Sequence, residues 1–330
     1  MTVLVTGGTG LTGANVCRQL RDRGDEVRAI VRSLPDAQPL AALGVELVAG
    51  DVTDAASVRA AAQGCDGVIH TAALLGGASQ ELSDFVAVNQ HGTANVLDAA
   101  AELEVRAVVL STGTFLDTTT GGPLEVAPVL ARPSNDPYTV TKLAAFRDAV
   151  ARAEAGQDVV IGHPGAIFGT SPVPQRALHP TSFNRVLLAG ARGRISRYLS
   201  FPVIWVFGED VARGAIAALD RGVRGERYWF DGRPQDVVST AECCNRLCAI
   251  AGIDHRVEDL DPDGDTAALE AEFGPTLVAI ARDPFAVGRV PRAEVTPTTE
   301  TLGYDPLPLD DGLDCFVGWL RELGRLDGAT

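Results

Sequence analysis

Lysine is the residue that this sequence has least of among the charged types. The chain of 330 residues carries 28 basic side chains, of which Lys142 is a lysine and the rest are arginines. A guanidinium is planar and always protonated, whereas an ammonium is a compact charge with three rotatable donors. Where positive charge alone suffices this chain uses arginine, so Lys142 is a candidate catalytic residue. The alternative is that a lysine-poor chain has placed its last lysine by chance.

Long apolar runs and an excess of basic charge are also missing. The longest apolar run, residues 201–207, is far shorter than the roughly 18 residues that a membrane span needs. A formal charge of −15 would repel a phosphate backbone, which argues against nucleic-acid binding. A strand pattern begins at Thr2, leaving no room for a targeting segment before it, so we expect a cytoplasmic protein.

The six cysteines are scattered along the chain rather than spaced as a disulfide or metal framework. Cys244 and Cys248 stand four residues apart on an expected helix, but no second pair lies at a spacing that would complete a metal site. We therefore expect reduced thiols and no bound metal.

Short apolar runs alternate with helical spacing in the first half of the chain. The runs are residues 3–5, 27–31, 45–49, 67–70, 107–110 and 159–161, and the helical stretches between them are 14–23, 55–62, 85–103 and 138–155. Apolar strands alternating with helices are typical of a parallel sheet covered on both faces. The predicted fold is therefore a doubly wound, mostly parallel α/β sheet of the Rossmann type, with a smaller C-terminal substrate lobe.

The domain bounds follow from where this alternation stops and resumes. We expect a dinucleotide-binding core over residues 1–168, to which the chain returns around 203–231. Residues 169–202, rich in proline and arginine, and 232–330 would form the substrate-binding lobe.

A glycine triplet marks the first strand-to-helix junction. Gly7 would permit the tight turn, Gly10 would let the backbone approach a pyrophosphate, and Gly13 would let the helix pack closely. The helix N-terminus beside Thr9 and Leu11 would then hold the anion. An ordinary turn is the alternative, but the triplet follows a strand and opens a helix at the start of a βαβ unit.

The end of the second strand indicates which cofactor binds. An NAD site usually carries an acid there for the ribose hydroxyls, and this chain has Val31 and Arg32 instead. Arg32 with Ser33 would suit a 2′-phosphate, which favours NADP(H) and leaves NAD(H) as the alternative. Asp51, after the third strand, would accept the adenine amino group or begin the next helix, a role for which Thr53 or Asp54 is better placed.

A series of motifs runs through most of the chain in a fixed order. They are residues 6–13 (TGGTGLTG), 51–52 (DV), 70–73 (HTAA), 88–93 (VNQHGT), 110–112 (LST), 138–142 (YTVTK), 163–169 (HPGAIFG) and 209–212 (EDVA). As a set they resemble the extended short-chain dehydrogenase/reductases, the NAD-dependent epimerase/dehydratase family. Within it the chain looks most like the dihydroflavonol-reductase-type NADPH carbonyl reductases, a likeness that rests partly on residues 27–32.

The pair Tyr138 and Lys142 fits the proton chemistry of hydride transfer. Reduction of a carbonyl needs a proton for the developing alkoxide, and free tyrosine has a pKa of about 10. An ammonium and a positive nicotinamide nearby would lower that pKa. The i, i+4 spacing places both side chains on one helix face, and Pro137 fits the helix start. A plain surface pair is the alternative.

Hydroxyls at the end of the fifth strand would polarise the carbonyl. The resemblance assigns this role to Thr112, with Ser111 as the reserve, and gives Asn89 a supporting structural role near the active site. It also implies that Val52, Thr71, Ala72, Ala73, Pro164, Gly165 and Ile167 contact the cofactor, together with Tyr138 and Lys142. His70, in the fourth-strand motif, is expected to be a hydrogen-bonded structural residue.

The sequence defines the substrate-binding residues less well than the cofactor-binding and catalytic residues. Apolar candidates for its wall are Leu74, Leu75, Phe115, Leu116, Phe183 and Tyr198, each of which could equally be core. His163 stands where many extended relatives carry arginine, which argues against sugar-nucleotide substrates. The leading hypothesis is NADPH-dependent reduction of a small ketone or aldehyde, reversible as alcohol oxidation.

Alternative functions remain open at this stage. The first is a nucleotide-sugar epimerase with tightly bound NAD, whose diphosphate would be gripped by Arg176, Arg185, Arg192, Arg194 and Arg197. A dehydratase is disfavoured by Gly113 and Thr114, which stand where those relatives carry an acidic pair. A non-catalytic NADP sensor is disfavoured by Tyr138 and Lys142. Substrate identity, stereochemistry, direction and the choice between monomer and homodimer stay undetermined.

Overall fold

Seven parallel strands form the main sheet in the computed structural model, which describes residues 1–75, 81–119, 123–282 and 296–326. In spatial order they are β10 (Arg227–Phe230), β6 (Val159–Pro164), β5 (Arg106–Leu110), β4 (Gly67–His70), β1 (Thr2–Thr6), β2 (Glu26–Val31) and β3 (Glu46–Ala49). The order runs outward in both directions from β1 and β4, as in a doubly wound sheet. The predicted fold class is confirmed.

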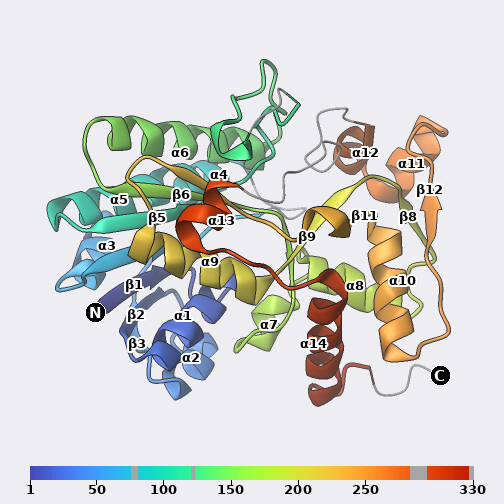
Figure 1. The fold of residues 1–330 in the computed structure, drawn as a ribbon, viewed down its shortest axis with the longest axis horizontal. Coiled ribbons are helices and arrows are strands. Elements are labelled where there is room, and N and C mark those ends of the chain that lie inside the picture. Colours follow the sequence, from blue (N-terminus) through green and yellow to red (C-terminus); the bar gives the residue numbers. More distant parts are fainter. Residues whose placement is uncertain (76–80, 120–122, 283–295, 327–330) are drawn as a thin grey trace.

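Helices cover both faces of this sheet (Figure 1). One face packs against α1 (Leu11–Arg23), α2 (Gln38–Ala42) and α9 (Gly208–Arg221). The other packs against α3 (Ala55–Ala62), α5 (Gly92–Glu102) and α6 (Pro137–Glu154). Because both faces are buried, alternate side chains of each strand enter different cores, which explains why the strands read as continuous apolar runs.

Residues near the C-terminal end of the chain cover the edge of the sheet at β10. The backbone N–H of Trp229 donates to the Thr298 hydroxyl at 2.9 Å, and that hydroxyl donates to Glu125 Oε1 at 2.6 Å. Thr298 lies in α13 (Pro297–Leu302), and Tyr304 packs its ring on Phe230. A short helix and a tyrosine therefore occupy the edge where another strand could otherwise pair.

The remaining elements build a lobe beside the carboxyl ends of the strands. Its sheets are β7 (Ala166–Phe168) with β9 (Val203–Phe207) and β11 (Val237–Val238), and β8 (Arg197–Leu199) with β12 (Glu258–Leu260). Its helices are α7 (Pro174–Ala177), α8 (Phe183–Ala191), α10 (Thr240–Ala251), α11 (Thr266–Phe273), α12 (Pro275–Arg282) and α14 (Leu309–Glu322), and a single turn, α4 (Leu82–Phe85), precedes α5.

The expected return of the chain to the core over residues 203–231 needs a correction at its start. β9 pairs with β7 in the three-stranded sheet, and its Trp205 and Phe207 belong to the lobe's apolar core. Only α9 and β10 return to the main sheet. An apolar run of this length has the same pattern in either sheet, so the sequence could not distinguish them.

All six cysteines are free thiols, five of them buried. Within the described ranges no group of side chains is arranged to hold a metal ion. The same ranges contain no helix whose length and apolar content would carry it through a bilayer.

Candidate functional site

The glycine triplet forms a cradle that only glycine fits. Gly7 has φ +70°, and a Cβ there would lie 2.6 Å from the Ala72 nitrogen. A Cβ on Gly13 would lie 2.3 Å from the Gly7 carbonyl oxygen. Gly10 precedes α1, where no side chain caps the helix and no acid stands in the first turn. Backbone N–H groups of this helix start are thus left for an anion, which fits a dinucleotide pyrophosphate.

Arg32 follows the last residue of β2 and is exposed. No ion pair holds its guanidinium among the residues that the structure describes. Asp51 is committed to a local turn, since its Oδ1 accepts from both the backbone N–H and the hydroxyl of Thr53 at 2.9 Å. Asp54 caps α3 by accepting from Ala56 N–H at 3.0 Å. The adenine contact of Asp51 stays a prediction, whereas the helix cap lies at Asp54.

His70 is a structural histidine whose protonation can be read from its neighbours. Thr93 gives its hydroxyl proton to Asn89 O at 2.7 Å, so it accepts from His70 Nε2 at 2.9 Å. Nδ1 then accepts from the Thr6 hydroxyl at 2.7 Å. Burial, with the nearby Lys142 charge, lowers the pKa of His70 to about 3. The residue is neutral and joins β1, β4 and α5.

Tyr138 and Lys142 lie at the start of α6, as the spacing predicts. Asp136 caps this helix by accepting from Thr139 N–H at 2.9 Å, and Pro137 is its first residue. The Tyr138 ring is half-buried. The Lys142 side chain is buried at 3% exposure, and its Nζ donates to Leu110 O at 2.7 Å. The lysine therefore reaches under the helix to the end of β5.

The pKa shifts caused by the protein's own groups run against the lowering expected for Tyr138, while the part of that lowering expected from the cofactor's charge stays a prediction. Burial raises the pKa of Tyr138 to about 12, with Asp136 adding to the rise and a hydrogen bond from Thr112 opposing it. Burial lowers the pKa of Lys142 to about 8. The Lys142 charge helps to lower the pKa of His70 and of His163, and it is not among the causes of the pKa shift of Tyr138. The protein alone therefore keeps Tyr138 protonated instead of favouring the phenolate.

Thr112, rather than Ser111, has its hydroxyl beside Tyr138. Thr112 Oγ1 accepts from Thr114 N–H at 3.4 Å, and its hydroxyl is close enough to the phenol to lower the pKa of Tyr138, against the larger effect of burial. The Ser111 hydroxyl is buried and has no hydrogen-bond partner among the described residues. The structure thus places next to the phenol the hydroxyl that the sequence preferred.

Asn89 supports the site without facing the phenol. It lies in a π-helical segment (Val86–His91), a distortion often found at functional sites. Its Oδ1 accepts from Leu74 N–H at 2.7 Å and its Nδ2 donates to Leu74 O at 3.0 Å and to Thr141 Oγ1 at 3.2 Å. It therefore ties the chain after β4 to α6, the expected structural role.

The expected substrate wall is only partly on the surface. Phe115 and Leu116 are fully buried in the core between the sheet and α6, so their assignment to the wall was wrong. Phe183 is 38% exposed and packs edge-on against Trp205. Leu75 is exposed, whereas Leu74 is half-buried. An apolar residue after a strand has the same pattern in a wall and in a core, which explains the error.

Tyr198 and the arginines of the lobe have other partners. The Tyr198 ring packs against Phe273 in the lobe. Arg197 pairs with Glu272 at 2.6 Å, and Arg192 donates to the Arg325 carbonyl. Two of the arginines expected to grip a diphosphate are thus engaged within the lobe.

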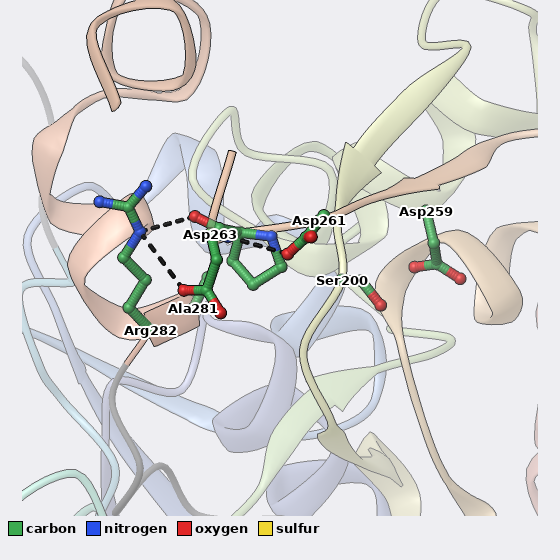
Figure 2. Close-up of a pocket in the computed structure, with 7 residues that line it drawn as sticks. Ser200, Asp259, Asp261, Asp263, Ala281 and Arg282 are labelled. Carbon is green, nitrogen blue, oxygen red and sulfur yellow. Dashed lines mark hydrogen bonds and ion pairs between the residues drawn. The ribbon is translucent and has the colours of Figure 1, made fainter. Parts of the chain in front are cut away.

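A cavity of about 640 Å³ lies in the lobe between β12 and α12 (Figure 2). Its lining includes Asp259, Asp261 and Asp263, and Arg282 faces Asp263 and the Pro262 carbonyl. None of the predicted catalytic or cofactor residues lines it. It is an acidic surface hollow separate from the Tyr138 site.

Several residues that shape the site were not found from the sequence. Asn184 clamps the backbone of Gly169, accepting from its N–H and donating to its carbonyl, both at 2.8 Å. Asn15 donates to Thr170 O at 2.8 Å, joining α1 to the same segment. Their partners lie far along the chain, so no local spacing pointed to them.

Comparison with known proteins agrees with this geometry. The model of the "NAD dependent epimerase/dehydratase family" matches residues 3–229. "Sterol demethylase protein B" of Methylococcus capsulatus is 35% identical over 70% of this chain and 70% of its own length. A "putative dihydroflavonol 4-reductase" of Synechocystis is 29% identical over 68% of this chain and 66% of its own. The crystal structure of a nucleoside-diphosphate-sugar epimerase from Pseudomonas aeruginosa superimposes with a TM-score of 0.77 at 25% identity, covering 99% of both chains.

Proposed function

The chain belongs to the NAD dependent epimerase/dehydratase family of extended short-chain dehydrogenase/reductases, which makes it an NAD(P)-dependent oxidoreductase, and we propose that it reduces a ketone with NADPH. The observation that carries the proposal is the Thr112 hydroxyl beside the phenol of Tyr138, where it acts on the pKa of that phenol, with the Lys142 ammonium buried beneath the same helix. These groups supply a proton donor, a carbonyl-polarising hydroxyl and a fixed positive charge.

The residues divide the reaction between them. Thr112 would donate its hydroxyl hydrogen to the carbonyl oxygen, and Tyr138 would pass its proton to that oxygen as the carbon is reduced. The bound nicotinamide supplies the hydride and, once oxidised, a positive charge beside the phenol. Burial raises the pKa of Tyr138 to about 12, so the phenol carries its proton before the reaction. A general acid donates best with a pKa near the working pH, so the positive charge of a bound, oxidised nicotinamide would have to lower this pKa again. The tyrosine then recovers its proton from solvent.

The preference for NADPH rests on Arg32 and the absence of an acid at the end of β2. An exposed guanidinium without an ion-pair partner in the described chain can fork onto a 2′-phosphate. The residues of the glycine cradle would hold the pyrophosphate in either cofactor. Arg32 is therefore the residue that would distinguish NADPH from NADH.

The proposed substrate is a ketone on an apolar ring scaffold. Phe183 and Leu75, two of the residues predicted to form the substrate wall, are exposed apolar side chains and would offer an apolar ring a surface to pack on. The names of the relatives point in the same direction, since one is a sterol demethylase protein and another a putative dihydroflavonol 4-reductase. A cytosolic enzyme with free thiols is part of the same proposal.

A sugar-nucleotide epimerase is less well supported. Such an enzyme needs cationic side chains free for a diphosphate, and two of the five candidates, Arg192 and Arg197, are engaged with the lobe's own carbonyl and carboxylate groups. The other three, Arg176, Arg185 and Arg194, form no ion pair in the described chain. His163 is buried beneath the site and cannot contact a substrate. The observation in its favour is the shared fold with the Pseudomonas aeruginosa epimerase.

The test is a cofactor titration followed by a ketone panel. We expect purified protein to bind NADPH reversibly and to oxidise it when aromatic or alicyclic ketones are added. Tyr138→Phe should lower kcat by about a thousandfold, since the proton donor is lost, while the dissociation constant for NADPH stays within about twofold. NAD retained through purification would favour the epimerase. NADPH binding with no turnover of any ketone would favour a sensor.

A further inference from the structure

His163 is a fully buried histidine directly beneath the site, and the mechanism above does not use it. It lies on β6, with its ring stacked on Trp229 at a centroid distance of 5.3 Å and 27°. Phe146 of α6 meets the same ring edge-on at 5.6 Å, and Phe115 does so at 6.4 Å. Three aromatic rings therefore fix the orientation of the imidazole.

The hydrogen bonding of His163 identifies its tautomer. Nδ1 lies 2.9 Å from the carbonyl oxygen of Thr112, which can only accept, so Nδ1 carries the proton. Nε2 is then an acceptor, and it is buried without a partner among the described residues. An unpaired buried acceptor destabilises a fold, and a phenylalanine would fill the same aromatic cage without it. Compared with a phenylalanine at this position, His163 adds the hydrogen bond to the Thr112 carbonyl.

Thr112 needs this bond because it lies beyond the sheet. β5 ends at Leu110, and Ser111 N–H still donates to Gly162 O at 2.7 Å. The carbonyl of Thr112 comes one residue later, where the chain turns away toward Thr114. The side chain of His163 thus acts where the regular strand pairing has stopped, on the residue whose hydroxyl meets Tyr138.

We propose that His163 is a positioning residue for the reaction: its Nδ1–H holds the Thr112 backbone so that the Thr112 hydroxyl stays aimed at the carbonyl oxygen beside Tyr138. This role rests on the proposed function. It acts through Thr112 alone, so it should affect the chemical step and leave cofactor binding unchanged. Small displacements of a polarising group are costly in rate.

A pair of substitutions separates the hydrogen bond from the packing. His163→Phe keeps an aromatic ring in the cage and loses the N–H. His163→Asn gives up the ring and keeps an amide N–H near the position of Nδ1. We expect His163→Phe to lower kcat by about tenfold to hundredfold, with KM and NADPH affinity within about twofold. His163→Asn should recover most of kcat despite a lower melting temperature. Equal kcat in His163→Phe and the wild type, or an asparagine variant no faster than the phenylalanine variant, would overturn the proposal.

A matched control and a readout without turnover complete the design. His255→Phe removes another histidine bond to a backbone carbonyl, that of Ile195 at 2.8 Å in the lobe, and should leave kcat unchanged. In ¹⁵N-histidine-labelled protein, His163 should show a protonated Nδ1 and a bare Nε2 throughout pH 5–8. A bare Nδ1 would overturn the proposal even if the enzyme is active. A wild type inactive on every ketone would instead overturn the proposed function. The ¹⁵N chemical shifts of His163 would still show whether its Nδ1–H bonds to the Thr112 carbonyl.

Discussion

At the scale of single residues, the enclosed ammonium of Lys142 is the feature that bears most on the candidate site. Lys142 is enclosed under α6, and its one hydrogen-bond partner in the described chain is the Leu110 carbonyl. Several arginines elsewhere in the molecule lie at the surface in ion pairs, as Arg59 does with Glu102. A guanidinium is larger, planar and more rigid than an ammonium, so it cannot occupy the same enclosed position.

We therefore predict that Lys142→Arg is nearly inactive although it keeps the charge. kcat should fall by about a hundredfold or more, because the larger planar guanidinium would displace the start of α6 and with it Tyr138. Steady-state kinetics with NADPH and the best ketone of the panel would measure the loss. Arg147→Lys, an exposed exchange on the same helix, is the control and should behave as the wild type. An active Lys142→Arg enzyme would show that only positive charge matters.

A second prediction concerns Arg32. Arg32→Asp should lower kcat/KM for NADPH by about tenfold to hundredfold, the effect of losing a charge-assisted hydrogen bond of about 1.5–3 kcal/mol. The aspartate would also suit ribose hydroxyls, so kcat/KM for NADH should rise. Arg59→Asp makes the same change in net charge on the surface of α3 and is the control. Unchanged cofactor kinetics in Arg32→Asp would remove Arg32 from the cofactor site.

Residue patterns predicted the parts of the site that are local in sequence. The choice of Thr112 over Ser111 came from the family resemblance, whereas the glycine cradle and the Tyr138–Lys142 pair follow from spacings of a few residues. The bond from His163 to Thr112 O and the clamp of Asn184 on Gly169 do not, since each depends on how distant segments meet. The direction of the Tyr138 pKa shift was also beyond the sequence, because burial, its main cause, is a property of the fold.

At the scale of elements, the cover on β10 shows how the end of the chain stabilises the core. Thr298 satisfies a strand N–H and a buried carboxylate with one hydroxyl. Its own N–H also donates to Glu125 Oε1 at 3.2 Å. Thr298 lies 69 residues from Trp229 and 173 from Glu125 along the chain, so the sequence predicted β10 but not what covers its edge.

We predict that Thr298→Val, which keeps the shape and loses the hydroxyl, destabilises the protein by about 3 kcal/mol. The Trp229 N–H would lose its acceptor and the buried Glu125 carboxylate would lose a donor. Urea denaturation would measure the change in the free energy of unfolding. Thr299→Val, whose hydroxyl bonds only to Thr296 in its own helical turn, should cost about 1 kcal/mol. Equal costs for the two variants would show that the edge contact contributes nothing.

At the scale of the whole molecule, the two buried histidines make the fold sensitive to acid. Burial, the main cause in both, lowers the pKa of His70 and of His163 to about 3 from 6.5. Between those values the unfolded chain binds more protons than the folded one. Stability is therefore complete above about pH 6.5 and is lost as pH falls toward 3.

The predicted loss at pH 5 is about 2 kcal/mol for each histidine, relative to pH 7.5. His163→Phe removes one of the two titrating groups, so its free energy of unfolding should fall by about 2 kcal/mol less than that of the wild type over the same pH interval. Urea titrations at the two pH values would measure this. The same dependence in both proteins would mean that His163 titrates with the same pKa in the folded and the unfolded protein.

The scarcity of lysine gives the molecule a chemical consequence beyond catalysis. Besides the N-terminal amine, which pairs with Asp25, the chain has a single primary amine, that of Lys142, which lies against the Leu110 carbonyl in the candidate site. Reductive methylation with ¹³C-formaldehyde would therefore give a two-signal spectrum, one of whose resonances monitors the active centre. Shielding of that amine by a ligand would turn the spectrum into a binding assay for any candidate substrate.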